Sequence, residues 1–468
     1  MSGAGGPLRD DVEVIILAAG LGTRMKSATV KVLHRAAGRP IVDYVLDLAA
    51  CVCSRPPVMV IGHQREEVRR SVGDRARYAI QEQQLGTGHA VLKAAEVLGR
   101  DGMTRKKVLI LSGDVPLTRP ETLVRLLDEH ERSRNALTLL TMKLTDPGLY
   151  GRIVRDDSGA VLRIVEAKDA GDEEKRIDEV NAGIYVFDGE PLFDNLRNLS
   201  NRNAQGEYYL TDLLGALRDA GQKVGSMLAA DPAEALGVNS RAELATVEGE
   251  IQRRVVVKLM DQGVTFRNPA TVVIDSTVTI GSDSVVYPFV TLEGETKIGK
   301  GCVIEPGVHL QNVTAGDNVH LKTGTVAEGS EIGDDSMVGP YAHLRPGTKL
   351  GRRVKIGNFV ETKKAVFGDG AKASHLSYIG DAEVGADANI GAGTITCNYD
   401  GVKKHKTVIE EGAFIGSDTQ LVAPVRVGKG AYVGAGSTIT KDVPPDALAL
   451  SRTPQRVVEG WAVKKREK

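Results

Sequence analysis

The chain has little of what marks membrane or nucleic-acid-binding proteins. Its 60 Lys and Arg side chains are balanced by 61 Asp and Glu side chains, which argues against a strong electrostatic footprint for nucleic acid or an anionic membrane surface. No apolar run approaches the roughly 18 to 20 residues that span a bilayer. The N-terminal residues lack the basic and apolar regions of a signal peptide. We therefore expect a soluble, cytoplasmic protein.

Cysteine and aromatic residues are also scarce. The four cysteines are scattered, and the one close pair, Cys51 and Cys53, has no second Cys or His pair nearby. This spacing matches neither a disulfide framework nor a zinc site. Aromatic residues make up only 4% of the chain, whereas glycine contributes 53 of its 468 residues, well above the usual ~7%. The composition predicts a large part of the chain that is rich in turns and poor in bulky side chains.

The first half of the chain alternates apolar runs with helical patterns. Four short apolar runs have the character of parallel strands covered on both faces, and helical segments such as Ile41–Ala50 and Glu121–Ser133 lie between them. The predicted strands are Val12–Ala19, Val58–Ile61, Val108–Leu111 and Leu137–Leu140. This alternation predicts an open α/β sheet, which binds ligands beyond the carboxyl ends of its strands.

A single long helix is predicted over Ser240–Gln262, between the two halves. Ser240 and Glu243 form a capping box at its start, and Gly263 can end it. Its apolar residues fall on one face. We expect this helix to link the two halves of the protein.

The second half is a six-residue repeat. Apolar residues recur every six positions from Ile274 to Leu310, again from Ile332 to Ile356, and again from Ile409 to Ile439. This is the hexapeptide pattern of a β-helix. Residues 267–443 provide roughly nine triangular coils of three hexapeptides each. The polar, basic segment Cys397–Thr407 breaks the repeat and must form a loop, either a tolerated insertion or an arm that reaches a ligand or a neighbouring subunit.

A glycine-rich turn follows the first predicted strand. Gly20 and Gly22 permit a tight turn with exposed backbone N–H groups, which suits the cradling of a phosphate. The turn lacks the third glycine of the dinucleotide fingerprint and the Gly-Lys-Ser/Thr of a Walker loop. With Arg24 and Lys31 close by in the sequence, anion binding is the favoured interpretation.

Longer motifs extend this turn into a family pattern. The run L-A-A-G-L-G-T-R-M from Leu17 and the run K-V-L-H from Lys31 resemble the sugar-nucleotide pyrophosphorylases. The match continues through Gln84–Ala90, Gly113–Leu117, Tyr150–Arg152, Gln205–Asp212 and Gly237–Ser240. Joined to the hexapeptide repeat and its run Gly391–Gly401, the chain resembles the bacterial bifunctional enzymes that are both N-acetylglucosamine-1-phosphate uridylyltransferases and glucosamine-1-phosphate N-acetyltransferases.

The resemblance implies an α/β Rossmann-like nucleotidyltransferase domain followed by a left-handed parallel β-helix. It divides the chain into a uridylyltransferase domain at residues 1–239, a linker helix at 240–263 and an acetyltransferase domain with its C-terminal tail at 264–468. The implied reactions are acetyl transfer from acetyl-CoA to glucosamine 1-phosphate and then Mg²⁺-dependent uridylyl transfer from UTP. The products, UDP-N-acetylglucosamine and pyrophosphate, belong to peptidoglycan and lipopolysaccharide precursor synthesis. The family also implies a homotrimer with acetyltransferase sites between subunits.

For the uridylyltransferase site, the resemblance implies a metal held by Asp114 and Asn239. Two anions meet in this reaction, so Mg²⁺ and cationic side chains should supply most of the catalysis. The nucleotide and the sugar would be bound by Leu17, Ala18, Ala19, Gly20, Arg24, Lys31, Gln81, Gly86, Thr87, Ser112, Gly113, Gly151, Glu166, Asn181 and Asn239. Val30 stands where the family usually has Pro, and Ser112 stands where some members have Tyr. These two departures affect the shape of one loop and one contact in the nucleotide pocket.

For the acetyltransferase site, the resemblance implies that His375 is the catalytic base. An ammonium group cannot attack a thioester, and a neutral imidazole can take its proton near pH 7. Arg345 and Lys363 would hold the substrate phosphate, and Tyr378 and Asn389 would position the sugar. Acetyl-CoA would be bound by Ala392, Asn398, Tyr399, Ser417, Ala435 and Arg452. The basic tail is interpreted as solvated, with contact to CoA as the alternative; it comprises Lys464, Lys465, Arg466 and Lys468.

Two other functions remain as alternatives. In one, the protein is a sugar-1-phosphate nucleotidyltransferase whose β-helix only trimerises; the long match around His375 and Tyr399 argues against it. In the other, the β-helix carries zinc on histidines as in a metal-dependent hydratase, but the histidines of this half show no paired ligand spacing.

Overall fold

The computed structural model describes residues 8–104 and 106–466, which form two compact units. The first unit extends to Ile251 and the second begins at Gln252. Part of the N-terminal segment considered above as a signal peptide, and Lys468 of the basic tail, lie outside the described residues. No helix in the described part of the chain is both long and apolar enough to cross a membrane.

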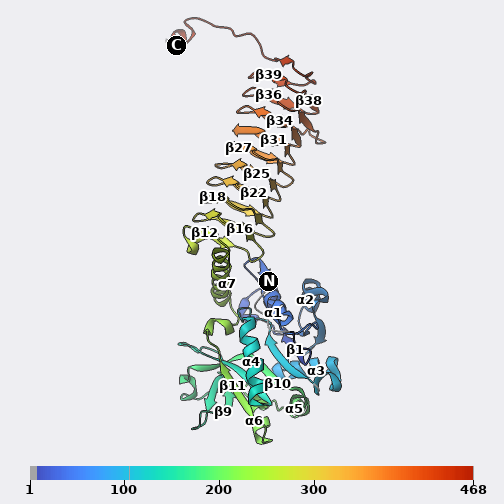
Figure 1. The fold of residues 1–468 in the computed structure, drawn as a ribbon, viewed down its shortest axis with the longest axis vertical. Coiled ribbons are helices and arrows are strands. Elements are labelled where there is room, and N and C mark those ends of the chain that lie inside the picture. The colour runs from blue at the N-terminus through green and yellow to red at the C-terminus, as the bar shows by residue number, and fades with distance from the viewer. Residues whose placement is uncertain (1–7, 105, 467–468) are drawn as a thin grey trace. The chain divides into compact units, whose positions relative to one another are not determined.

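The first unit is built on a nine-stranded sheet with the strand order β11-β7-β10-β6-β1-β4-β5 and with β8 and β9 off this path (Figure 1). The bounds are β1 Val12–Leu17, β4 Val58–Ile61, β5 Arg77–Ile80, β6 Lys107–Ser112, β7 Leu137–Lys143, β8 Arg152–Arg155, β9 Val161–Val165, β10 Glu179–Asp188 and β11 Val224–Leu228. The four predicted strands are β1, β4, β6 and β7; β4 has the predicted ends, and at least one end of each of the others is shifted. β10 runs antiparallel to both of its neighbours, β6 and β7, so the sheet is mixed.

Two layers of helices cover this sheet. Alternate residues of β1 show why both faces are covered: Val14 and Ile16 belong to one apolar cluster and Ile15 to the other. The first cluster includes residues of α1 Ile41–Ala50, α2 Arg65–Val72 and α4 Pro120–Ser133. The second includes residues of α3 Thr87–Thr104, α5 Gly189–Leu196 and α6 Leu213–Asp219. The carboxyl ends of the parallel strands remain open for a ligand.

The predicted long helix is α7, Arg241–Asp261. Its start is capped in both directions: the Glu243 N–H donates to the Ser240 hydroxyl at 3.2 Å, and the Asn239 N–H donates to the Glu243 carboxylate at 2.6 Å. At its end, Gly263 has φ +93° and its N–H donates to the Met260 carbonyl at 2.9 Å. The capping fixes the backbone of Asn239 directly before the first turn of the helix.

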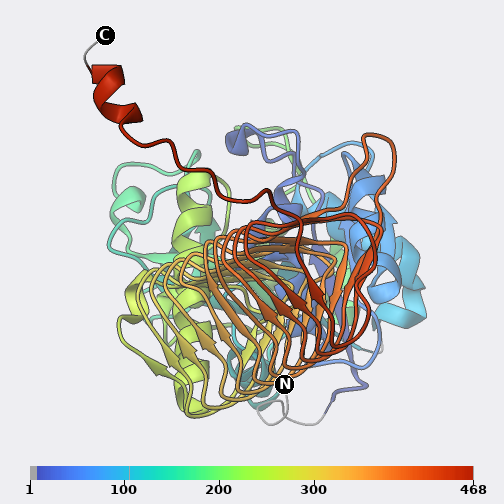
Figure 2. The same ribbon diagram turned by 90° about the horizontal axis from the view of Figure 1, so that it is seen from above.

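The second unit is a left-handed parallel β-helix made of three sheets. One sheet contains β12 Thr265–Phe266, β15 Val285–Val286, β18 Val303–Ile304, β21 His320–Leu321, β24 Met337–Val338, β27 Lys355–Asn358, β30 Lys372–His375, β33 Asn389–Ile390, β36 Phe414–Ile415, β39 Tyr432–Val433 and β41 Leu448–Ala449. The next contains β13 Val273–Ile274, β16 Thr291–Glu293, β19 His309–Gln311, β22 Val326–Glu328, β25 His343–Leu344, β28 Glu361–Lys363, β31 Tyr378–Gly380, β34 Ile395–Cys397, β37 Gln420–Val422 and β40 Thr438–Ile439. The third contains β14 Thr279–Ile280, β17 Lys297–Ile298, β20 Thr314–Ala315, β23 Glu331–Ile332, β26 Lys349–Leu350, β29 Val366–Phe367, β32 Ala382–Val384, β35 Thr407–Ile409 and β38 Val425–Val427. The end-on view shows the successive coils stacked on one another (Figure 2).

The repeat explains the core of this unit. Residues such as Val286, Ile304 and Leu321 pair in register from coil to coil, and each is completely buried. One apolar residue per strand therefore points inward, as the six-residue period predicts. Small side chains are enough to fill the interior of the β-helix, because the sides of the prism lie close together. This accounts for the scarcity of aromatic residues in the chain.

Several coils are shorter than the predicted eighteen residues. Leu310 and Ala315 are inward neighbours only five residues apart, so Ala315 pairs with Ile298 at an offset of seventeen. Asn312 makes the tighter corner with φ +53°, a left-handed conformation that Asn tolerates. The apparent gap in the repeat between Leu310 and Ile332 is therefore a change of coil length. The residues between Cys397 and Thr407 do leave the prism, with Val402 82% exposed, whereas Cys397 ends β34 and Thr407 begins β35.

The stacked, inward-pointing residues of the β-helix lead to a prediction about its stability. Leu344 is completely buried, so Leu344→Ala should lower the free energy of unfolding by about 2 to 5 kcal/mol. Val366 is 45% exposed on an outer face, so Val366→Ala should change it by less than about 0.5 kcal/mol. Denaturant unfolding followed by circular dichroism measures both. Equal effects of the two substitutions would contradict the assignment of inner and outer faces.

Candidate active sites

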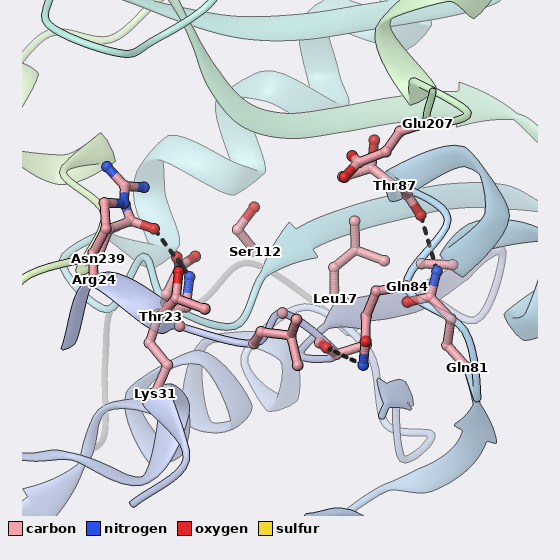
Figure 3. A pocket seen from close by; sticks show the side chains of 17 residues that line it. Leu17, Thr23, Arg24, Lys31, Gln81, Gln84, Thr87, Ser112, Glu207 and Asn239 are labelled. Atoms are coloured by element: carbon pink, nitrogen blue, oxygen red, sulfur yellow. Dashed lines mark hydrogen bonds and ion pairs between the residues drawn. The ribbon is translucent and has the colours of Figure 1, made fainter. Parts of the chain in front are cut away.

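A cavity of about 440 Å³ lies at the carboxyl ends of β1 and β6 in the first unit (Figure 3). Its wall comes from the glycine-rich turn, the segment before α3, the ends of the two strands and the residue before α7. It is lined by Leu17, Ala19, Gly20, Leu21, Gly22, Thr23, Arg24, Lys31, Gln81, Gln84, Gly86, Thr87, Ala90, Ser112, Asp114, Glu207 and Asn239. Segments that are far apart in the sequence thus meet at the edge where an α/β sheet binds its ligands.

The cavity brings together most of the residues predicted for the nucleotide. Ala18 and Gly113 do not line it; Ala18 is buried, and Gly113 donates its N–H to the Leu17 carbonyl at 2.9 Å. Gly22, expected in the phosphate-binding turn, lines the cavity, as do five residues that were not predicted: Leu21, Thr23, Gln84, Ala90 and Glu207. These five residues lie within the sequence motifs that carried the resemblance, so the motifs could have indicated them.

Lys31 joins two oxygen atoms inside this cavity. Its Nζ lies 2.5 Å from Asp114 Oδ2 and 3.1 Å from Asn239 Oδ1 (Figure 3). The side chains of Lys31 and Asp114 are only 14% and 16% exposed, so the charges attract each other strongly in a partly dehydrated site. A carboxylate and an amide oxygen that converge on one cationic group form an oxygen pair that suits a hard divalent cation.

The glycine-rich turn offers unused donors to the same cavity. In the described residues, no acceptor is recorded for the backbone N–H groups of residues 20–23. Gly22 has φ +61°, and a side chain there would come within 2.8 Å of Lys31 Cβ, so only glycine lets the lysine approach. Val30, at the usual proline position, has φ −55° and ψ 135°, a conformation that proline also favours. Val30 therefore has a backbone conformation that a proline at this position could also adopt.

Gly151, Glu166 and Asn181 lie next to each other but outside the cavity lining. The Asn181 N–H donates to the Gly151 carbonyl at 2.8 Å, and a side chain at Gly151 would meet the Glu166 carboxylate at 3.4 Å. Burial raises the pKa of the Glu166 carboxyl above its ordinary value, against the opposing hydrogen bond from Thr211. This cluster reaches the cavity through Ser112, whose hydroxyl donates to the Gly183 carbonyl at 3.2 Å.

In the second unit, His375 is exposed and its ring is oriented by a neighbour. Its Nδ1 lies 2.6 Å from Oδ1 of Asn358, the residue paired with it on the adjacent coil. Because the amide oxygen can only accept, Nδ1 carries the proton and Nε2 keeps its lone pair. Asn358 was not among the predicted residues; it is assigned to the candidate site because of this hydrogen bond to His375.

The residues predicted for the phosphate lie together on one sheet. Arg345 Nη1 is 2.7 Å from the Glu361 carboxylate, and Glu361 pairs in register with Tyr378. Lys404 on the inserted loop lowers the pKa of Lys363, with a smaller effect from Arg345 in the same direction. Three cationic side chains thus gather at one place, although Lys404 was not predicted. Asn389 lies on a different sheet, paired with Lys372 and Phe414.

The residues predicted for acetyl-CoA follow one corner of the β-helix. The Ala392 carbonyl accepts from the Asp418 N–H at 2.7 Å, and the Ser417 carbonyl accepts from the Gly436 N–H at 2.8 Å. Arg452 Nη1 continues this line with a hydrogen bond to the Ala435 carbonyl at 2.9 Å. On the inserted loop, Asn398 Nδ2 donates to Asp381 at 2.5 Å, and Tyr399 is 59% exposed.

The tail residues Lys464, Lys465 and Arg466 are exposed on a short helix, α8 Trp461–Arg466. Among the described residues no group of three or more His, Cys, Asp or Glu side chains could hold a metal ion.

Comparisons with known proteins agree with this division of the chain. Residues 13–233 match the nucleotidyl transferase family, and residues 277–312, 329–364 and 406–441 match the bacterial transferase hexapeptide family. A bifunctional protein GlmU of Pelobacter propionicus is 51% identical over 98% of this chain and 100% of its own. The corresponding proteins of Syntrophotalea carbinolica and Brevibacillus brevis are 53% and 48% identical, over 97% and 95% of both chains.

The chain belongs to the bifunctional GlmU family. Membership confirms the predicted bifunctional enzyme, with uridylyltransferase and acetyltransferase activities that lead to UDP-N-acetylglucosamine, and the predicted combination of folds. It does not favour the alternative in which the β-helix only trimerises. GlmU proteins act on small molecules, the nucleotidyl transferase family generally uses a divalent metal, and hexapeptide repeats are typical of proteins that oligomerise.

Glu166 makes a prediction about stability and pH. A carboxyl whose pKa is raised on folding destabilises the folded state when it is ionised. Glu166→Gln should therefore raise the thermal midpoint at pH 7 to 8, and the gain should shrink as the pH falls toward the ordinary glutamate pKa. Thermal unfolding across this pH range measures the effect. A stabilisation that instead grows at low pH would contradict the buried, costly carboxylate.

Proposed function

We propose that uridylyl transfer from UTP to N-acetylglucosamine 1-phosphate takes place in the cavity of the first unit. The observation that carries this proposal is the convergence of Lys31, Asp114 and Asn239 beside free backbone N–H groups of the glycine-rich turn. Such a turn binds phosphate oxygens through its N–H groups, and Lys31 and Arg24 add positive charge. Residues 1–239 would form this domain, and residues 240–263 the link to the acetyltransferase domain at 264–468.

Asp114 and Asn239 would hold Mg²⁺, because both offer the oxygen ligands that this ion prefers. When bound, Mg²⁺ would neutralise charge that develops on the phosphate oxygens. Lys31 and Arg24 hold the triphosphate in line with the attacking oxygen of the sugar phosphate, and the low exposure of Lys31 strengthens its attraction for the phosphate. Glu166 and Asn181 face the sugar, where a buried carboxylate can accept hydrogen bonds from hydroxyl groups.

Asp114→Ala should lower uridylyl transfer by about 10³-fold or more, since the loss of a metal ligand removes several kcal/mol of charge stabilisation. Acetyl transfer should stay near wild type. Both rates are measured on the same preparation, by pyrophosphate release and by thiol release from acetyl-CoA. Asp128→Ala, at a side chain that is 60% exposed on α4, is the matched control. If Asp114→Ala lowered both activities equally, misfolding or a wrong assignment would be the reason.

We also propose that acetyl transfer takes place on the β-helix with His375 as the base. Asn358 keeps the proton on Nδ1, so Nε2 is free to take a proton from the ammonium form of the substrate. The amine so formed attacks the acetyl carbonyl carbon, the C–S bond breaks, and CoA leaves as the thiol with the second proton of the amine. Arg345, Lys363 and Lys404 would bind the phosphate, and Tyr378 and Asn389 the sugar. The line from Ala392 through Ser417 and Ala435 to Arg452, with Asn398 and Tyr399, would bind acetyl-CoA.

A trimer would complete this site. Tyr341, Phe359 and Leu376 stand at the same corner of three successive coils and are 55%, 56% and 62% exposed. The rings of Tyr341 and Phe359 stack at 5.7 Å. An apolar stripe of this kind supports a contact between copies of the chain, and it lies next to Asn358 and His375. We propose a homotrimer that works in the cytoplasm.

His375→Ala should lower acetyl transfer by roughly 10²- to 10⁴-fold, the range for a positioned general base. Uridylyl transfer should persist, and the residual acetyl transfer should rise with pH because a larger share of the amine is already deprotonated. His309→Ala, at an exposed histidine of the same β-helix, is the control. Sedimentation must first show that the variant keeps its oligomeric state. Near-wild-type acetyl transfer at pH 7 in such a variant would refute the role of His375.

A further inference from the structure

The side-chain amide of Gln81 is held in one orientation on the wall of the cavity. Gln81 is 3% exposed, and its Nε2 donates to the Gly86 carbonyl and to Nδ1 of His89, both at 3.0 Å. Figure 3 shows the bond to Gly86. Both hydrogens of the amide nitrogen are thereby used. No donor among the described residues is recorded for Oε1, so the amide offers an acceptor to a ligand in the cavity.

His89 can accept this hydrogen bond because its ring is neutral and its tautomer is fixed. Burial and the charge of Lys93 lower the pKa of His89, and the backbone of Gln83 and the charge of Glu96 act in the opposite direction. Because the Gln81 amide nitrogen can only donate, the lone pair on Nδ1 faces Gln81, and the single proton of the neutral ring is on Nε2.

We propose that His89 is a positioning residue for nucleobase selection, because it holds the Gln81 amide so that Oε1 faces the ring nitrogen of the base. The inference rests on the proposed binding of UTP in this cavity. Uracil carries an N–H at ring position 3, whereas cytosine carries a lone pair there. A fixed acceptor pairs with the uracil N–H and repels the cytosine nitrogen. A reversed amide would offer a donor and would suit cytosine, so the proton position on His89, together with the Gly86 carbonyl, sets the selectivity.

Substitutions at position 89 that alter the hydrogen-bonding partner of Gln81 test this proposal. His89→Gln keeps an acceptor, His89→Leu removes it, and His89→Lys replaces it with a donor. The measured quantity is the ratio of kcat/KM for UTP to kcat/KM for CTP, with N-acetylglucosamine 1-phosphate as the second substrate. The ratio should stay near wild type for His89→Gln. It should fall about tenfold for His89→Leu, which is the effect expected from the loss of about one net hydrogen bond. It should fall further for His89→Lys.

A merely structural role for His89 would lower the rates with UTP and CTP together and leave their ratio unchanged, and that result would overturn the proposal. Gln81→Leu provides a second test. If His89 acts through Gln81, His89→Leu should change the ratio little further in a Gln81→Leu background; independent, additive effects would also overturn the proposal. Circular dichroism and thermal unfolding of each variant report whether the first unit is correctly folded. Failure of UTP itself as a substrate for the wild-type enzyme would instead refute the proposed function.

Discussion

Parallel, in-register pairing of strands is the constraint on which both sites depend. In the first unit it sets Leu17 beside Ser112 at the ends of β1 and β6, so the segments that follow both strands open onto one cavity. In the second unit it sets Asn358 beside His375 and Glu361 beside Tyr378. Residues that are distant in the sequence therefore become neighbours without any irregular backbone at the point of contact.

Both proposed sites contain polar side chains whose hydrogen-bond partners leave one atom free for a ligand. The Asn358 oxygen engages one nitrogen of His375 and leaves the other with its lone pair. His89 and Gly86 engage the nitrogen of Gln81 and leave its oxygen for the cavity. In each case the neighbouring residue takes no part in the reaction, but it excludes one orientation or tautomer of the side chain that it contacts. This is pre-organisation, which lowers the cost of ordering the site when substrate binds.

The cationic residues of the two proposed sites differ in the charge of their neighbours. Lys31 has acidic and amide partners that a divalent metal would share, whereas Lys363 and Lys404 stand close together and oppose each other's charge. A phosphate that binds between these side chains would be attracted by both charges, as the proposed site for a phosphorylated sugar requires.

The sequence predicted much of this architecture, because a six-residue period and buried apolar runs have few structural solutions. It did not include β10 among the predicted strands, and therefore missed the antiparallel neighbour of β6 and β7. It missed the seventeen-residue coils, because a corner such as Asn312 can lose one residue without disturbing the inward positions. Asn358 and Lys404 were missed because their roles arise only from contacts with residues on other coils or loops.

The central claim is that two independent sites on one chain catalyse successive reactions. Mixing the Asp114→Ala and His375→Ala variants with UTP, acetyl-CoA and glucosamine 1-phosphate tests it most directly, with product followed by chromatography. Each variant alone should make almost no UDP-N-acetylglucosamine from these substrates, whereas the mixture should make it at a substantial rate, because the acetylated intermediate passes from one protein to the other through solution. If the mixture were as inactive as its components, although each variant retained its other activity, the two sites would not act independently and the account would be wrong.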